Sequence, residues 1–277
     1  MRVRTPIAVL DDARPGQERL TVLTGFLGAI TAENSAQISD ALAALNAANA
    51  SGETLAGYFS YELGYGLEGK LAGRMPEPRA APLLWFGRFA QAQHLTGTDI
   101  DAWFTANIVG RAYAGPLHVA WTREEYCTRF AQVQEKIRDG DIYQANLTFP
   151  GIFSFAGDAL ALYRDIRPRA SAGYGAYLWD GARDILSFSP ELFFEISNGV
   201  ITARPMKGTA PRGDNAQSDS RLRAQLQLSE KDRAENLMIV DLIRNDISRV
   251  AQTGSVRVDN LFAVETYPTV HQMVSTI

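Results

Sequence analysis

One lysine stands on unusually stiff backbone. The segment RPMKGTAPRG, residues 204–213, places Lys207 between two prolines and directly before a glycine. A lysine attacks an electrophilic carbon only as the free amine, a form that desolvation or nearby cations favour. Arg204 and Arg212 are candidates for such nearby cations. The pattern therefore indicates a nucleophile or a general base.

The alternative for Lys207 is a surface lysine in a turn, which is the usual situation of this residue type. Gly208 and Thr209 weaken that alternative. Glycine lets the backbone approach a ligand closely, and free N–H groups on stiff backbone hold anions. We expect both residues to border a substrate.

A glutamate follows a Ser-Pro pair at a strand start. Glu191 could act as a general acid if it holds its proton near neutral pH and reaches a leaving group. The alternative is a charge at a strand edge, or an ion pair with a neighbouring arginine. Sequence alone favours that alternative.

Two carboxylates three residues apart could hold a metal ion. Asp232 and Glu235 would lie on one face of a helix near its N-terminus. Mg²⁺ takes one or two carboxylates and keeps several waters. Equally, Asp232 could cap the helix while Glu235 complements its dipole. His271 could line the same site, but a lone histidine among apolar neighbours is more often a satisfied core residue.

Helix and strand signals position these side chains. Thr122 opens a helix with the T-x-x-E capping box, and apolar residues repeat at helical spacing until Gly140. Residues 142–149 then predict a strand whose polar face carries Gln144. A polar strand face either meets solvent or lines a polar cavity.

A hairpin brings Glu191 toward Lys207. Residues 193–197 and 200–204 are separated by Asn-Gly, the signature of a two-residue type I′ turn. Counting back along that register places Glu191 near Met206. Lys207 therefore lies at the same open end of the hairpin as Glu191. The flanking prolines interrupt the ladder. The register therefore does not determine whether the two side chains lie on the same face of the hairpin.

The last long helix begins at Ser229, with Asp232 at the reciprocal capping position. Residues 237–243 are apolar on nearly every side, which predicts a buried helix. Earlier in the chain, the sequence predicts strands or strand-turn units at 18–30 and 55–67 and a strand at 82–95. It also predicts a helix at 37–50, an exposed loop at 70–82 and a seam at 109–116.

Composition excludes several classes of protein. The chain has 277 residues, of which 46% are hydrophobic, and a formal net charge of -4, which favours neither nucleic acid nor a membrane surface as partner. A single cysteine excludes an internal disulfide framework. The start lacks the apolar core of a signal peptide, and no apolar run could span a bilayer. We expect a cytoplasmic α/β (α+β) protein.

Taken together, the motifs resemble those of the chorismate-utilising enzymes, and within them the para-aminating branch, the component I aminodeoxychorismate synthases. The resemblance runs in order from about residue 55 through GYFSYELGYGLE, GDIYQANLT, SFSPELFFEI, RPMKGTAPRG, SEKDRAENLMIVDLIRND and VETYPTVHQMVS. It implies a sandwich of mostly antiparallel sheets with helices between. Residues 1–115 would form the N-terminal part, and 116–277 the first part of the catalytic core.

The resemblance also implies roles. Lys207 would attack the chorismate ring as the 4-hydroxyl leaves, and ammonia would then displace it to give 4-amino-4-deoxychorismate. Glu191 would be the general acid/base. Glu235 would bind Mg²⁺ directly and Asp232 more indirectly, through water. The backbone at Gly208 and Thr209, together with His271, would border the ring.

Two further positions discriminate among relatives. Anthranilate-forming relatives carry alanine where Lys207 stands, so that lysine favours para over ortho amination. Gln144 occupies the place where isochorismate-forming relatives carry a water-activating lysine, which disfavours hydroxylation. The implied partner is a glutamine amidotransferase subunit that supplies ammonia. The alternatives are anthranilate synthase component I and a non-catalytic relative that binds tryptophan or another protein.

The chain also departs from the family pattern. Relatives continue beyond the HQMVS segment with a G-A-P-K-type loop, an arginine for a substrate carboxylate and a second pair of magnesium glutamates. We therefore expect an incomplete C-terminal part. We also expect residues 1–277 alone to bind chorismate and Mg²⁺ weakly and to turn over negligibly.

Overall fold

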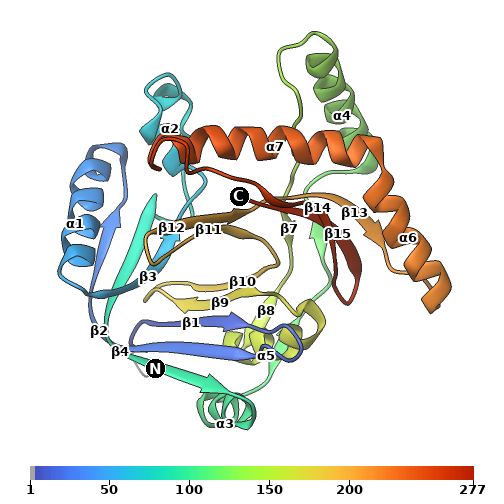
Figure 1. Cartoon of the computed structure of the whole chain (residues 1–277). Coiled ribbons are helices and arrows are strands. Elements are labelled where there is room, and N and C mark those ends of the chain that lie inside the picture. The colour runs from blue at the N-terminus through green and yellow to red at the C-terminus, as the bar shows by residue number, and fades with distance from the viewer. Residues whose placement is uncertain (1–3) are drawn as a thin grey trace. The chain divides into compact units, whose positions relative to one another are not determined.

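The computed structural model describes residues 4–277 (Figure 1). Its largest sheet has six strands in the order β10-β9-β1-β2-β4-β3, and every neighbouring pair is antiparallel. The strands are β1 (Ile7–Asp12), β2 (Arg19–Ala32), β3 (Thr54–Phe59), β4 (Leu84–Thr96), β9 (Tyr174–Trp179) and β10 (Asp184–Ser189). From Thr24 to Thr31, strand β2 alternates half-buried and exposed residues, as a half-covered sheet requires.

Two clusters of buried apolar side chains on this sheet lie among the described residues. One cluster joins Trp85 and Phe89 of β4 to Leu23 of β2 and Leu178 of β9. The other lies under α1 (Ile38–Ala50), whose Ile38 meets buried residues of β2 and β4. The short helical segments around it are α2 (Leu63–Leu67) and the 3₁₀ turns Ser35–Gln37 and Ala72–Arg74. The helix at 37–50 and the strands at 18–30 and 82–95 are confirmed.

The predicted hairpin is confirmed as β11 (Leu192–Ser197) and β12 (Val200–Arg204), with Ser197 opposite Val200. Asn198 and Gly199 both have positive φ, at 51° and 75°, as a type I′ turn demands. The ladder shifts register between Leu192 and Glu195, where a bulge interrupts strict alternation.

A three-stranded antiparallel sheet follows in the order β13-β15-β14. Its strands are β13 (Met206–Pro211), β14 (Asp259–Thr266) and β15 (Val270–Thr276), and α6 (Ala216–Leu228) and α7 (Glu230–Ser248) pack on it. Figure 1 shows α7 lying across β13 and β15. This sheet and α7 carry most of the predicted site.

The chain folds as two compact units. One holds the residues up to Thr105 together with Tyr163–Ile277, and the other is Ala106–Leu162. The second unit contains α4 (Arg123–Arg138) and two small antiparallel ladders, β5 (Ala112–Ala114) with β8 (Phe155–Gly157) and β6 (His118–Val119) with β7 (Gly151–Ile152). The boundaries between the two units fall within α3 (Thr98–Asn107) and α5 (Ala159–Ala170). The six-stranded sheet thus combines strands from both sides of residue 115, and the predicted division 1–115 and 116–277 stays a prediction.

Helix α4 follows the sequence closely. The Thr122 side chain accepts a hydrogen bond from the Glu125 N–H at 3.2 Å, and the Glu125 carboxylate accepts one from the Thr122 N–H at 2.8 Å. The helix is followed by Gly140, whose φ is 78°. Both halves of the predicted capping box are therefore present.

Two predictions of secondary structure and burial are wrong. Residues 142–149 form no strand, because no strand in the described chain pairs with their backbone groups. Helix α7 is not buried all round: Leu237, Met238 and Leu242 are exposed, while Asn236 and Val240 are buried. Within residues 4–277, the buried residues of α7 are on the face that packs on the sheet.

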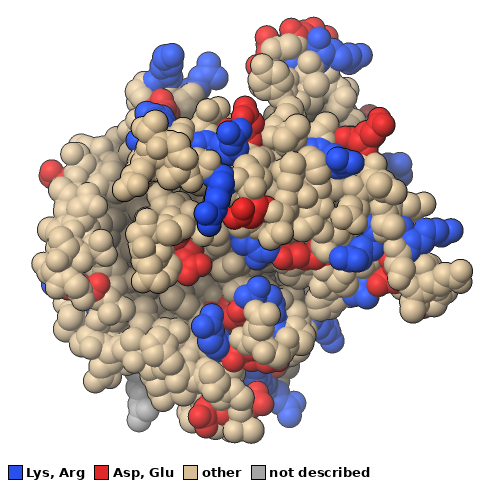
Figure 2. Space-filling model, viewed as in Figure 1, with Lys and Arg blue, Asp and Glu red and all other residues tan. Residues whose placement is uncertain are grey.

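Charge is mixed on the surface shown in Figure 2, where Lys and Arg side chains are interspersed with Asp and Glu. Within residues 4–277, no helix combines the length and the hydropathy needed to cross a bilayer. The expected lack of a nucleic-acid or membrane partner stays a prediction.

Candidate active site

Lys207 lies in a β-bulge. Strand β13 pairs with β15 at Met206 opposite Val274 and again at Thr209 opposite Gln272. Lys207 and Gly208 therefore both stand opposite the single residue Met273. A bulge changes the direction of side chains along a strand, which is why alternation in the sequence could not orient the lysine.

Gly208 brings the bulge against α7. Its φ is +104°, a conformation that side chains rarely adopt. A Cβ at Gly208 would lie 2.9 Å from the Cβ of Asp232 and 3.2 Å from the Cβ of Met273. The residue after Lys207 is thus in direct contact with one of the two predicted metal ligands, and only glycine fits there.

Glu191 contacts the residue that precedes Lys207. The Met206 N–H donates a hydrogen bond to Glu191 Oε1 at 3.0 Å. The Ser189 hydroxyl accepts from the Glu191 N–H at 3.2 Å and so holds the turn that starts β11. The predicted proximity of Glu191 to Met206 is confirmed. The glutamate is exposed, so solvent or a ligand can reach it.

Asp232 has an unused carboxylate. Ser229 caps α7 by accepting from the Asp232 N–H at 3.3 Å, but the Ser229 N–H donates to Leu226 O instead of to Asp232. The reciprocal half of the predicted capping box is absent. Among the described residues, the Asp232 carboxylate has no hydrogen-bond or ion-pair partner.

Glu235 is only loosely paired, with Lys231 at 3.7 Å, and that lysine is largely exposed. Within residues 4–277, no cluster of three or more His, Cys, Asp or Glu side chains is arranged to hold a metal ion. The half-buried pair of Asp232 and Glu235 nevertheless fits Mg²⁺, because this ion takes one or two protein carboxylates and completes its shell with water and substrate oxygens.

The two arginines do not leave a free cation beside Lys207. Arg204 forms an ion pair with Glu265, whose other oxygen accepts from the Tyr267 hydroxyl at 2.9 Å. Arg212 binds Asp219 through two N–H groups, at 2.7 and 2.9 Å. Each guanidinium group is paired with a carboxylate, and the expectation that the two arginines favour the free amine of Lys207 stays a prediction.

His271 is fully buried and both of its ring nitrogens are engaged. Nδ1 lies 3.0 Å from Thr266 Oγ1, and Nε2 lies 3.0 Å from Asp219 Oδ1. Hydrogen bonds from Arg212, and then from the Gly213 N–H, hold the pKa of Asp219 well below its usual range. This is the satisfied core histidine that the sequence left as an alternative, and neither nitrogen is available to a ligand.

The remaining predicted contacts differ in accessibility. Thr209 is exposed, and its hydroxyl donates to Gln272 Oε1 at 3.0 Å. Gln144 belongs to the unit Ala106–Leu162, in irregular backbone, where its Oε1 is buried with no hydrogen-bond partner. Their contact with substrate stays a prediction.

Sequence reasoning missed Asn236. This asparagine is fully buried on α7, next to Glu235, and its amide reaches the backbone carbonyls of Lys207 and Met273. The signal was present, because an amide that is followed by the apolar run LMIV must find polar partners when it is buried.

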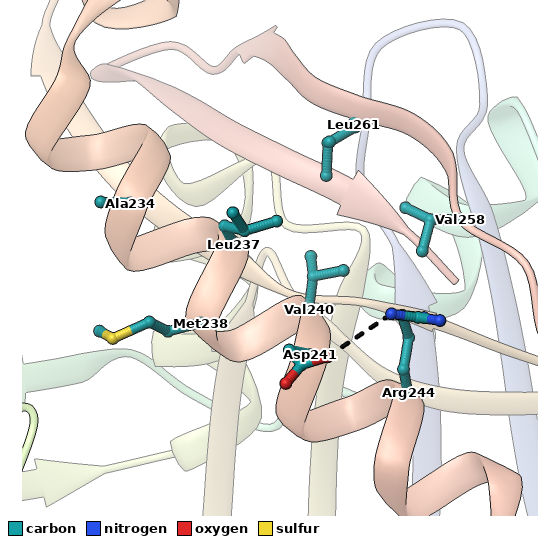
Figure 3. A pocket seen from close by; sticks show the side chains of 8 residues that line it. All are labelled: Ala234, Leu237, Met238, Val240, Asp241, Arg244, Val258 and Leu261. Carbon is teal, nitrogen blue, oxygen red and sulfur yellow. Dashed lines mark hydrogen bonds and ion pairs between the residues drawn. The ribbon is translucent and has the colours of Figure 1, made fainter.

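Helix α7 also borders an apolar hollow of 690 Å³ (Figure 3). Asp241 and Arg244 form an ion pair at 3.5 Å within its lining. The hollow is lined by Ala234, Leu237, Met238, Val240, Asp241, Arg244, Val258 and Leu261. None of the predicted site residues lines this hollow.

Comparison with known proteins gives one family. The family model described as chorismate binding enzyme matches residues 5–277. Aminodeoxychorismate synthase component 1 of Klebsiella aerogenes is 43% identical over 180 residues, covering 64% of this chain and 40% of that protein. The protein of the same name from Escherichia coli K12 is 48% identical over 156 residues, covering 56% of this chain and 34% of that protein. The matched region therefore spans well under half the length of these relatives.

A solved structure shares the fold. The isochorismate synthase DhbC from Bacillus anthracis, described as putative and 2,3-dihydroxybenzoate-specific, superposes with a TM-score of 0.67. The match covers 97% of this chain and 66% of that one, at 16% identity. At this identity the likeness concerns the fold alone, an α+β arrangement with antiparallel sheets.

Proposed function

Because the chain belongs to the chorismate binding enzyme family, we propose that it carries the nucleophile, the acid and one side of the metal site of an aminodeoxychorismate synthase. One observation carries the proposal. The two neighbours of Lys207 touch the other two groups: Met206 donates to Glu191, and Gly208 contacts Asp232. Two acidic residues that lie apart in the sequence thus contact the residues on either side of Lys207.

Lys207 is the proposed nucleophile. Its Nζ lone pair forms a C–N bond to the chorismate ring while the bond to the 4-hydroxyl breaks. Ammonia then forms its own C–N bond and displaces the lysine, which leaves 4-amino-4-deoxychorismate and water. The covalent adduct divides one difficult substitution into two easier ones.

Glu191 is the proposed acid. Hydroxide is a poor leaving group, so a proton must reach the departing oxygen, and the Glu191 carboxyl supplies it. The Met206 N–H holds one carboxyl oxygen at 3.0 Å, which leaves the other oxygen for the substrate. The same group takes up the proton that ammonia loses.

Asp232 and Glu235 would hold Mg²⁺, with Glu235 in direct contact and Asp232 through water. When bound, the ion would neutralise the charge of a chorismate carboxylate and orient the ring. The Gly208 and Thr209 backbone would then lie beside the substrate. Both carboxylates are free enough to bind a metal ion. The Asp232 carboxylate has no other partner among the described residues, and Glu235 is paired only with Lys231, at 3.7 Å.

The ammonia source belongs to the same proposal. The relatives are named component 1, which implies a second component. We propose that it is a glutamine amidotransferase and that the protein works in the cytoplasm, in the synthesis of para-aminobenzoate and folate.

The test supplies the polypeptide, in the length that the source cell makes, with chorismate, ammonium and Mg²⁺. We expect 4-amino-4-deoxychorismate by mass spectrometry and chromatography. Lys207→Arg keeps the positive charge but removes the nucleophile, so we expect a rate loss of at least about 10³-fold. Lys136→Ala, at an exposed lysine in α4, is the control and should keep full activity. Anthranilate as product, or an active Lys207→Arg variant, would contradict the proposal.

A further inference from the structure

A buried amide supports the bulge that carries Lys207. Asn236 on α7 is fully buried, and its Nδ2 donates to Lys207 O at 3.5 Å and to Met273 O at 3.4 Å. Lys207 and Met273 face each other across the bulge, where the regular ladder is interrupted. A backbone carbonyl that is shielded from water needs a hydrogen-bond donor, and the Asn236 amide supplies one to each of these two carbonyls.

The orientation of that amide is set from its other end. The fully buried Ser275 hydroxyl donates to Asn236 Oδ1 at 2.6 Å, so Nδ2 must face the two carbonyls. The same hydroxyl accepts from the Phe262 N–H at 3.1 Å. Phe262 has φ +60° and lies in the second register shift of this sheet, on β14.

The hydrogen-bonded pair of Asn236 and Ser275 thus connects two register shifts, one on each side of β15. The bulge of β13 lies opposite Met273, and the irregularity of β14 lies opposite Ser275. Asn236 also follows Glu235 directly and lies one helical turn after Asp232. Its contacts therefore link the backbone of Lys207 to the helix that presents both carboxylates.

We propose that Asn236 is a positioning residue, which holds the Lys207 bulge in register with the carboxylates of α7. The expected effect on the reaction rate rests on the proposed function. The expected effect on the position of the Lys207 bulge can be measured without turnover. A nucleophile must meet its carbon at the right distance and angle, and a displacement of about 1 Å can lower the rate by about 10²-fold.

The test uses Asn236→Asp, which preserves the shape but replaces the two N–H donors with an oxygen that faces two carbonyls. Asn245→Asp makes the same chemical change at an exposed position of the same helix and is the matched control. Ser275→Ala removes the hydrogen bond that orients the amide and leaves both N–H donors. Circular dichroism melts establish which variants fold.

The first readout requires no catalysis. Each protein is treated with a limiting amount of acetic anhydride across a pH series, and peptide mass spectrometry gives the acetylation rate of Lys207 relative to the exposed Lys70. We expect the ratio to move at least about 3-fold toward unity in Asn236→Asp, since a released bulge lets solvent reach the half-buried lysine. Ser275→Ala should move it in the same direction, and Asn245→Asp should leave it unchanged.

The second readout separates kcat from KM. We expect Asn236→Asp to lower kcat by about 10²-fold with a smaller change in KM for chorismate. Folded variants with the labelling ratio and the kcat of the wild type would overturn the proposal. The failure of both Asn236→Asp and Ser275→Ala to fold would also overturn it, because the pair would then have a purely structural role. A wild-type protein that forms no aminated product would refute the proposed function alone, since the labelling ratio still reports on the bulge.

Discussion

Replacing Gly208 by alanine should strain the backbone of the candidate site and place a methyl group against Asp232 and Met273. The residue has φ +104°, and a conformation of this kind costs about 1–3 kcal/mol for a residue other than glycine. The new Cβ would lie 2.9 Å from Asp232 Cβ and 3.2 Å from Met273 Cβ. Overpacking of this degree adds about 1–3 kcal/mol. We therefore expect Gly208→Ala to lower the free energy of unfolding by about 2–6 kcal/mol.

Gly181 offers a matched control, because it separates backbone strain from crowding. It lies in the turn between β9 and β10 with φ +99°, and a Cβ there would meet only Pro6 Cγ at 3.7 Å, an ordinary contact. Gly181→Ala should thus show the strain without the collision. In denaturant titrations, the difference between the two variants should be about 1–3 kcal/mol.

The collision also has a functional consequence. The simplest relief is a movement of Asp232 away from β13, which would weaken Mg²⁺ binding measured by calorimetry, while Gly181→Ala leaves it unchanged. If Gly208→Ala unfolds at the same denaturant concentration as Gly181→Ala and binds Mg²⁺ as the wild type does, then the close approach of α7 to the bulge is not part of the native structure.

Three further predictions concern the metal site, acid stability and the hairpin. Asp232→Asn and Glu235→Gln should each weaken Mg²⁺ binding by about 10-fold or more, and calorimetric affinities equal to wild type would refute the assignment. Because Arg212 lowers the pKa of Asp219, the stabilising effect of this carboxylate is present above about pH 4 and is lost as the pH falls below it, so Asp219→Asn should show a shallower loss of stability in acid than the wild type does. Gly199→Val, at φ 75° in the hairpin turn, should destabilise the protein by about 1–2 kcal/mol in denaturant titrations, and an unchanged midpoint would contradict the turn type.

Local signals in the sequence predicted several features correctly. The capping box at Thr122, the turn at Asn198 and the approach of Glu191 to Met206 all depend on residues close together in the chain. Their geometry follows from hydrogen bonds between near neighbours in the chain and from the dihedral preferences of those residues. The family resemblance in turn connected these local features to chorismate.

Long-range pairing was beyond the sequence. Residues 142–149 have the alternation of a strand but find no partner strand in the described structure, and strand propensity alone does not form a ladder. Arg204 and Arg212 stand beside Lys207 in sequence, yet their charges are used by Glu265 and Asp219. Glu265 lies 61 residues beyond Arg204, and a partner at that separation cannot be assigned from spacing.

By itself, the sequence determined which chemical groups this protein possesses and the local turns that present them, since these depend on residue type and near neighbours. Only the tertiary structure decided that Lys207 occupies a bulge, that Gly208 contacts Asp232 and that Asn236 connects the two elements. The physical reason is that a bulge and its support arise where a helix packs on a sheet. Their energies depend on contacts between segments that no local pattern relates.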